Sequence, residues 1–396
     1  DLKHLSNAAL AGLDKKNIVG IDLTKLTTDQ FPALTVDQLN TIAGASTAKV
    51  AAISDDEISA LTVTQAKGLS VAFVDALTAG QIAKLSPEAI AALAPKSFAV
   101  ADFSGLTSDN AASITSAQLA ALTPAQVTSL AVTNAKLQYA PTNAVAGLTD
   151  KNIVGLTDLS STKITADQFA ALKPAQVAAL PTAAIALLTS SADSIAALTP
   201  GIIALLTYDQ IAALPTAQFA NIPVAAIGAL TARTIVGLGD GSTTANTAAA
   251  NASNHIHQLT ADQAAALTPD AIKGLIATQV DGGHTDGLTS TAFAAINPVS
   301  LKAMQPATLK AIAATTFDGI TPEQVAVLSP AQAKALDATQ IAKFGADDAE
   351  AITPAQAAVW SAVQANALTS AALAAMTPDA ISKLNITNFD GTSTTA

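Results

Sequence analysis

Histidine and aspartate side chains in two glycine-rich segments are the groups with the clearest potential for chemistry. Imidazole nitrogens and carboxylate oxygens are common transition-metal ligands, and two histidines placed two residues apart in an extended loop can face one ion. The candidate metal ligands are Asp240, His255, His257, Asp281, His284 and Asp286. Because no complete ligand set at a known spacing is present, the pattern favours solvated polar loops over a metal site.

Five Asp-Gly pairs raise calcium as a second candidate ion. Acidic, glycine-rich loops can supply the several oxygen ligands that Ca²⁺ requires at about 2.4 Å. The pairs begin at Asp240, Asp281, Asp286, Asp318 and Asp390. The sequence has neither an EF-hand loop nor a glycine-rich calcium-binding nonapeptide, and Asp-Gly is also an ordinary turn pair. We therefore expect no cofactor, with calcium as the one ion left open.

Familiar catalytic and nucleotide-binding motifs are missing from the sequence. It contains no Gly-x-Ser-x-Gly, no phosphate-cradling glycine loop and no His-Glu-x-x-His. It also contains no cysteine, which excludes disulfides and thiolate metal sites. We predict that the protein is not an enzyme.

Charge and hydropathy exclude two further classes of function. Lysine and arginine number 19 against 30 aspartates and glutamates, so the net charge is −11, and the basic residues are scattered. A nucleic-acid-binding protein needs a basic patch that replaces phosphate counterions. Half of the residues are hydrophobic, yet no apolar run approaches the roughly 18 to 20 residues of a membrane span. We expect no nucleic-acid partner and no membrane insertion.

An octapeptide repeat underlies this composition. From Leu288 to Leu384, every eighth residue is large and apolar, and the same step runs through most of the chain. The consensus is Thr-Pro-Ala-Gln-Ile-Ala-Ala-Leu, and residues 123–130, 173–180 and 321–328 are the clearest copies. A fixed period of this kind is typical of solenoids and arrays, in which one unit cannot fold alone.

Each octad carries the signals that begin a helix. Thr or Ser is a preferred N-cap, Pro fits the first helical position, and Gln or Glu three residues after the cap completes a capping box. Recurrent Pro interrupts a continuous helix, in which an eight-residue step would also overshoot two turns by about 80°. We predict an all-α solenoid of very short helices, one per octapeptide, with two or three octads per coil. A β-solenoid is the alternative, weakened by an apolar spacing of three and five instead of two.

Breaks in the repeat predict the domain organisation. The largest break begins at Gly239 and is polar and glycine-rich, which is typical of a loop. We expect a first solenoid segment over 1–238, a loop insertion over 239–258, a second solenoid segment over 259–387, and a tail or linker over 388–396.

The units at 122–130, 172–180 and 206–214 resemble the Leu-Thr-x-x-Gln-Ile-x-Ala-Leu arrays found in very large bacterial secreted and surface proteins. The resemblance covers most of the chain. It implies export and a structural role at the cell surface, and it carries over no catalytic residue.

These observations lead to one expected function and one alternative. We expect a non-enzymatic extracellular or cell-surface structural protein, a repeat rod that associates with copies of itself into a filament, sheath or surface layer. Open solenoid ends and Ala- and Thr-rich flanks of low charge favour such association. The alternative is an adhesin stalk or a binding module, in which the Thr and Ser caps repeated once per octad contact a surface glycan or ice.

Overall fold

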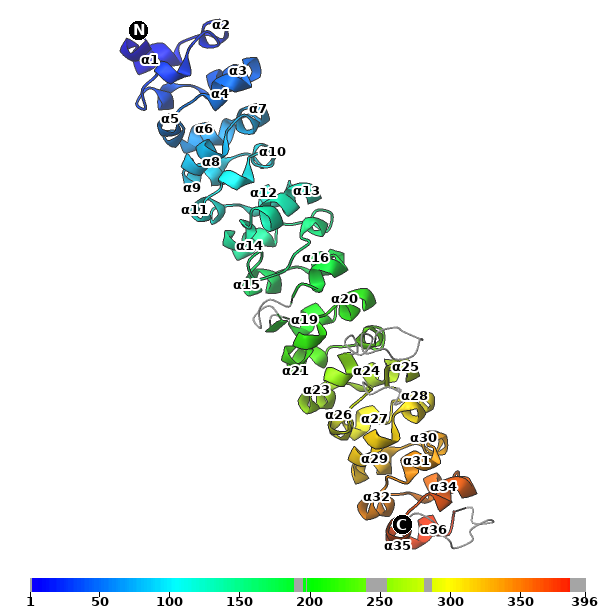
Figure 1. Ribbon diagram of the computed structural model, residues 1–396. Helices are drawn as coiled ribbons and strands as arrows, with labels where there is room; N and C mark the ends of the chain where they lie inside the picture. The colour runs from blue at the N-terminus through cyan, green and yellow to red at the C-terminus, as the bar shows by residue number, and fades with distance from the viewer. Residues whose placement is uncertain (1, 189–194, 197, 240–254, 281–286, 385–396) are drawn as a thin grey trace. The chain divides into compact units, whose positions relative to one another are not determined.

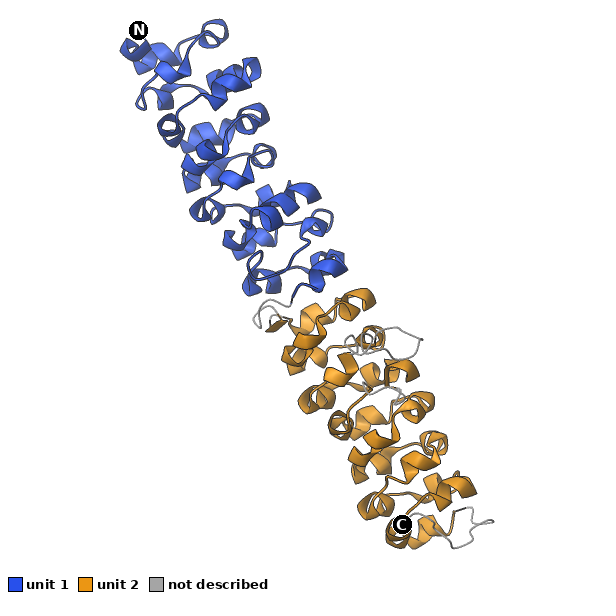
Figure 2. Cartoon of the chain, viewed as in Figure 1, with its two compact units in different colours: residues 1–194 blue, residues 195–396 orange. Residues whose placement is uncertain are grey.

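The computed structural model describes residues 2–188, 195–196, 198–239, 255–280 and 287–384. The chain divides into two compact units, residues 1–194 and 195–396 (Figure 2). In each unit, very short helices follow one another along the chain (Figure 1). The described residues contain no β-strand, so the predicted all-α solenoid is confirmed and the β-solenoid alternative is wrong for them.

Unit 1 consists of short α-helices and shorter helical turns, joined by a few extended residues, and its longest helix is α3, with 10 residues. Its elements are η1 (Leu2–His4), α1 (Asn7–Ala11), α2 (Lys15–Ile18), η2 (Leu23–Lys25), η3 (Phe31–Ala33), α3 (Val36–Ala45), α4 (Thr47–Ala51), α5 (Asp55–Ser59), α6 (Val63–Gly68), α7 (Val71–Asp75), α8 (Ala79–Lys84), α9 (Pro87–Ala92), α10 (Pro95–Phe98), η4 (Phe103–Gly105), α11 (Ser108–Ala111), α12 (Ser116–Ala120), α13 (Pro124–Thr128), η5 (Ser129–Thr133), η6 (Leu137–Tyr139), α14 (Thr142–Val145), η7 (Ile153–Gly155), α15 (Ala166–Ala170), α16 (Pro174–Ala179) and α17 (Thr182–Ile185).

Unit 2 is built in the same way. Its described elements are α19 (Pro200–Ile203), α20 (Tyr208–Ala212), η8 (Thr216–Asn221), α21 (Val224–Ile227), η9 (Ile235–Leu238), η10 (His255–Gln258), α23 (Ala261–Ala266), α24 (Pro269–Gly274), α25 (Ala277–Val280), α26 (Ser290–Ala295), α27 (Pro298–Leu301), α28 (Pro306–Ala311), η11 (Ala314–Gly319), α29 (Pro322–Val327), α30 (Pro330–Ala335), α31 (Ala338–Ile341), α32 (Ala346–Glu350), α33 (Pro354–Ala357), α34 (Ala362–Asn366), α35 (Ser370–Ala375) and α36 (Pro378–Ile381).

Helix starts follow the predicted capping chemistry. In the octad 321–328, the hydroxyl of Thr321 accepts a hydrogen bond from the backbone N–H of Gln324 at 3.3 Å. The side-chain Oε1 of Gln324 accepts in return from the backbone N–H of Thr321 at 3.1 Å. This is a capping box, and Pro322 occupies the first helical position, where its missing N–H costs nothing.

Three octads make one coil in both units. In unit 2, α28, α30 and α33 stack in succession, and they begin at Pro306, Pro330 and Pro354, which are 24 residues apart (330 − 306 and 354 − 330). In unit 1, α6 packs on α9, which begins 24 residues later (87 − 63). Of the two predicted possibilities, the structure therefore adopts three octads per coil.

Helices one coil apart form three stacked columns in residues 289–384 of unit 2. Column I contains α26, η11, α31 and α34. Column II contains α27, α29, α32 and α35. Column III contains α28, α30, α33 and α36. Each coil thus contributes one octad to each column, and the surface of every column repeats once per coil.

A narrow aliphatic core lies between the columns. Every residue at the eighth octad position from Leu288 to Leu384 is buried. The fifth position is buried from Phe293 to Ala365, for example at Val325, which is 1% exposed, whereas Ile381 near the end of the described range is 41% exposed. Aromatic rings occupy a few of these sites, and the rings of Phe293 and Phe317, one coil apart, contact each other at a tilt with their centroids 5.1 Å apart. Burying these apolar side chains supplies the stabilisation that a single octad lacks.

The structure describes only part of the predicted loop and none of the predicted tail. Residues 240–254 of the predicted loop at 239–258, and all of the predicted tail at 388–396, lie outside the described residues. Residues 255–258 differ from the expectation, because they form η10, which packs on η8. In this octad Ile256 and Leu259 are buried at the fifth and eighth positions, so the repeat has resumed by residue 255.

Candidate functional site

The fourth octad position holds the polar groups that join one coil to the next, and we call its residues the ladder residues. The amide of Gln332 is 1% exposed. Its Nε2 donates to the carbonyls of Leu301 at 3.1 Å and Met304 at 2.9 Å, both in the preceding coil. Its Oε1 accepts from the backbone N–H of Ser329 at 2.8 Å. One side chain therefore completes the capping box of its own helix and also binds the preceding coil.

Most ladder glutamines repeat this arrangement, with a carbonyl partner commonly 28 residues earlier in the chain. The others whose Nε2 donates in this way include Gln38, Gln65, Gln81, Gln118, Gln168, Gln263, Gln324, Gln340, Gln356 and Gln364. The sequence indicated only the local capping role of these glutamines. Their long-range role was not predicted, although the recurrence of glutamine at the fourth position, beside an apolar fifth position, was a usable signal.

Shorter and charged side chains replace glutamine at some ladder positions. The hydroxyls of Ser300, Thr308 and Thr316 each donate to one carbonyl of the preceding coil, at 2.7, 2.9 and 2.9 Å. Lys49 donates its Nζ to the carbonyls of Val19 and Ile21. Where the fourth position carries a donor of suitable reach, it satisfies buried carbonyls that would otherwise be costly to leave unpaired. Other octads have alanine there, as at Ala271 and Ala292, and lack this side-chain bond.

His255, a predicted metal candidate, is a ladder residue. It is 1% exposed, its Nε2 lies 2.5 Å from the carbonyl oxygen of Leu214, and its ring centroid lies 5.0 Å from that of Phe219. Since a carbonyl only accepts, this contact places the proton on Nε2. Nδ1 is buried without a hydrogen-bond partner among the described residues. Burial lowers the pKa of His255 below its usual value, opposed by the hydrogen bond to Leu214.

The remaining metal candidates do not form a described site. His257 directs its Nδ1 to the carbonyl of Gly287 at 3.0 Å. Asp240, Asp281, His284 and Asp286 lie outside the described residues. Over the ranges that the structure does describe, no three His, Cys, Asp or Glu residues are close enough to hold a metal ion. Metal or calcium binding through the two glycine-rich segments stays a prediction.

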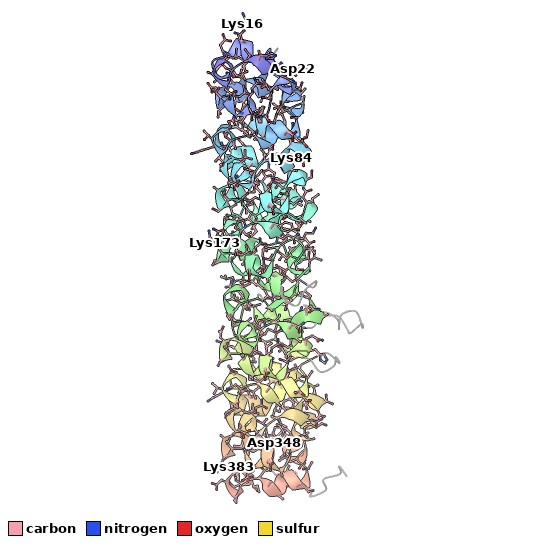
Figure 3. The ribbon with its side chains drawn as sticks, turned by 90° about the vertical axis from the view of Figure 1, so that its left-hand side faces the viewer. Lys16, Asp22, Lys84, Lys173, Asp348 and Lys383 are labelled. Carbon is pink, nitrogen blue, oxygen red and sulfur yellow. The ribbon has the colours of Figure 1, made fainter. Side chains whose placement is uncertain are left out.

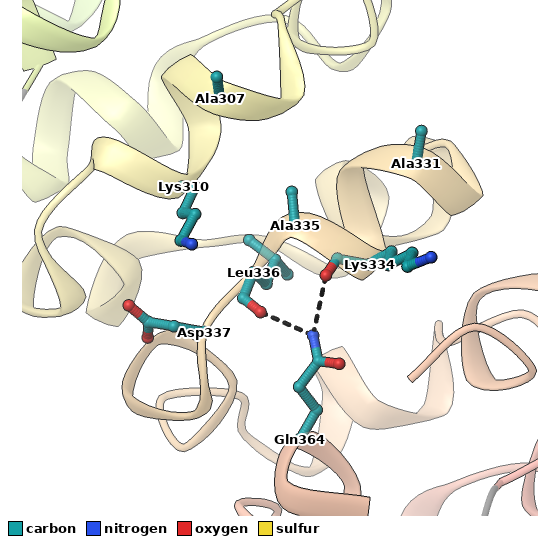
Figure 4. Close-up of a pocket in the computed structure, with 8 residues that line it drawn as sticks. All are labelled: Ala307, Lys310, Ala331, Lys334, Ala335, Leu336, Asp337 and Gln364. Atoms are coloured by element: carbon teal, nitrogen blue, oxygen red, sulfur yellow. Dashed lines mark hydrogen bonds between the residues drawn. The ribbon is translucent and has the colours of Figure 1, made fainter. Parts of the chain in front are cut away.

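A shallow hollow of about 510 Å³ opens between columns III and I of unit 2 (Figure 4). Its floor and walls are small or apolar: Ala307, Ala331, Ala335 and Leu336. The ladder residue Gln364 closes one side, donating to the carbonyls of Leu336 at 2.6 Å and Lys334 at 3.2 Å.

Three charged side chains stand at the rim of this hollow. Lys310 extends from α28 toward Leu336 and Asp337, and Lys334 lies on α30, one coil later (Figure 4). Asp337 is already engaged as the N-cap of α31, accepting from the backbone N–H of Gln340 at 2.9 Å. Both lysines are exposed, but the Lys334 side chain points away from Lys310 and Asp337 (Figure 4), and the lining offers neither a nucleophile nor a free acid–base pair.

Column II carries charge of the opposite sign. Glu323 on α29 and Asp347 on α32 are exposed and occupy the same octad position in successive coils. Asp348 lies beside them but is half-buried, and its carboxylate accepts from the backbone N–H of Gly345 at 2.9 Å. Desolvation raises the pKa of Asp348, and the nearby charges of Asp347 and Glu323 act in the same direction.

The surface elsewhere is sparsely charged. Exposed lysines such as Lys84, Lys173 and Lys383 project singly from the helices (Figure 3). Exposed apolar side chains are also scattered, and the most exposed are Val299 and Val363, each at 69%. None of the helices in the described ranges has the length and apolar character needed to cross a membrane. Comparison of the sequence with known protein families and with curated proteins found no match.

Proposed function

We propose that this chain is a non-enzymatic structural protein, an octad-repeat solenoid that associates with copies of itself into a filament, sheath or surface layer. The observation that carries the proposal is the column architecture of residues 289–384, in which each side presents the same octad positions once per 24-residue coil. A surface with this period on one molecule can be matched repeatedly by the same surface on another.

The character of the surface supports association over catalysis. The hollow at α28 and α30 is shallow, and its polar side chains do not converge on one point: Asp337 caps α31 and Gln364 bonds to backbone carbonyls, whereas enzyme sites need convergent polar groups in a concave pocket. Only 12% of the residues are charged, which keeps repulsion between flanks low for a chain of net charge −11. An extracellular or cell-surface location rests on the resemblance to the octapeptide arrays of bacterial secreted and surface proteins.

The alternative of a glycan- or ice-binding module depends on free cap hydroxyls. In the octads that begin at Thr62, Thr115 and Ser329, the hydroxyl accepts from the third helical N–H and also lies 3.0 Å from the glutamine Oε1. These hydroxyls use both their donor and an acceptor site within their own octad. This favours a scaffold role, because fewer cap groups are left to recognise an external lattice.

Electron microscopy and sedimentation velocity of the purified chain test the proposal. We expect particles whose size grows with protein concentration, measured over a range of ionic strength and with or without Ca²⁺. A monodisperse monomer under every condition would overturn it. Thermal hysteresis or selective binding on a glycan array, without assembly, would favour the binding-module alternative.

A further inference from the structure

We propose that copies of this chain dock side by side, with Glu323 and Asp347 on column II of one copy facing Lys310 and Lys334 on column III of another. The inference rests on the proposed self-association and specifies which surfaces make the contact. All four side chains are exposed. None of the four forms an ion pair within the described part of the chain.

The repeat itself sets the spacing of both charge pairs. Lys310 and Lys334 are 24 residues apart (334 − 310), and so are Glu323 and Asp347 (347 − 323). Each pair is therefore separated by the rise of one coil. Two copies share that rise, so two carboxylates of one copy meet two ammonium groups of another in register. The match holds whether the two copies run parallel or antiparallel, because the lysine pair carries two positive charges and the acidic pair carries two negative charges.

The shape of column III suits such an approach. Ala307 and Ala331 line the hollow beside the two lysines, so no large side chain separates the ammonium groups from an incoming helix. Lysine stems are flexible and place their charge at some distance from the backbone. Close approach of an acidic row is consequently possible without rearranging the core.

A second copy fits this surface better than an unrelated acidic partner. Single exposed ion pairs contribute little, so the two lysines favour a partner whose carboxylates match both of them at once. A copy of the chain offers counter-charges at the identical coil spacing.

The contact uses different surfaces on the two copies. In a pair of copies, the lysine pair of one copy and the acidic pair of the other stay free, so further copies can bind. A heterologous contact of this kind propagates unless its rotation closes a ring. The geometry therefore favours an open lateral assembly over an isolated dimer.

Charge reversal on the full chain tests the pairing. One variant carries Lys310→Glu and Lys334→Glu, and the other carries Glu323→Lys and Asp347→Lys. Each variant alone brings like charges together, so we expect the concentration at which assembly begins to rise by about tenfold or more at low salt. An equimolar mixture restores complementary rows and should assemble at about the wild-type concentration.

A matched control separates this pairing from a change in net charge. Lys67→Glu with Lys84→Glu alters the charge of exposed unit 1 helices by the same amount and should leave assembly unchanged. Circular dichroism verifies that every variant is folded. If wild-type chains assemble but the reversed variants assemble equally well, or their mixture fails to recover, the pairing is wrong and self-association stands. If wild-type chains do not assemble at all, the proposed function and this contact both fall.

Discussion

Two consecutive coils of unit 2 use different ladder residues to bind the coil before them. The coil of residues 297–320 uses hydroxyl ladder residues, each of which donates one hydrogen bond to the coil before it. The coil of residues 321–344 uses glutamines, each of which donates to at least two carbonyls and accepts from one backbone N–H. We call them the hydroxyl coil and the glutamine coil.

Helix starts differ between the two coils in the same sense. The glutamine coil begins its helices at Thr321, Ser329 and Asp337, each with a side chain that caps the helix. In the hydroxyl coil, Gln305 and Ala313 provide no side-chain cap. Glutamine thus couples a local helix start to a long-range contact, whereas a hydroxyl serves the long-range contact alone. We expect the glutamine coil to depend more strongly on its ladder residue.

Removing one ladder residue from each coil gives the largest expected effect. Gln332→Met keeps the side-chain length but leaves buried carbonyls and the Ser329 N–H without a partner, which should cost about 2–4 kcal/mol. Thr308→Val removes only the bond to Leu275 and should cost about 1 kcal/mol. Hydrogen exchange of the local backbone amides measures both. Equal losses would show that the two coils do not differ.

A third kind of ladder residue makes stability depend on pH. Burial depresses the pKa of His255, so the unfolded chain binds a proton first as the pH falls below about 6.5. Stability is therefore greatest above that pH, and it falls by up to about 1.4 kcal/mol per pH unit until the folded-state pKa is reached.

His255→Gln tests this effect by installing the common ladder residue. We expect the difference in thermal stability between pH 7.5 and pH 5 to shrink, because glutamine does not titrate. His257→Gln is the matched control, since that ring is only partly buried and bonds to Gly287. An unchanged pH dependence in His255→Gln would contradict this account.

The smallest expected effect comes from adding an N-cap to a helix of the hydroxyl coil that lacks one. Gln305 precedes Pro306 at the start of α28 in the same way that Ser329 precedes Pro330 at the start of α30, but its side chain makes no capping bond. Gln305→Ser should stabilise the hydroxyl coil by about 0.5–1 kcal/mol, because its hydroxyl can accept from the third helical N–H. Chemical denaturation measures the gain. No gain would mean that α28 is already satisfied without a cap.

Local contacts of the ladder residues could be predicted from the sequence, but their contacts with the preceding coil could not. The pairing of Thr321 with Gln324 was predictable, because a capping box joins residues three apart. The bonds from Gln332 to the preceding coil were not, because the number of octads per coil decides which carbonyl lies within reach. His255 shows the same limit: its type suggested a metal ligand, while its place in the octad register makes it a ladder residue.

Local chemistry alone determined the short helices, their starts and the buried faces, since N-caps, Pro and the apolar period act within eight residues. The tertiary structure decided that three octads complete a coil, that ladder residues bind from coil to coil, and that Lys310 and Lys334 stand over one hollow. The physical reason is that stacking is a long-range choice. Octads with the same local signals can be stacked two or three to a coil, and only the packing of neighbouring coils selects between them.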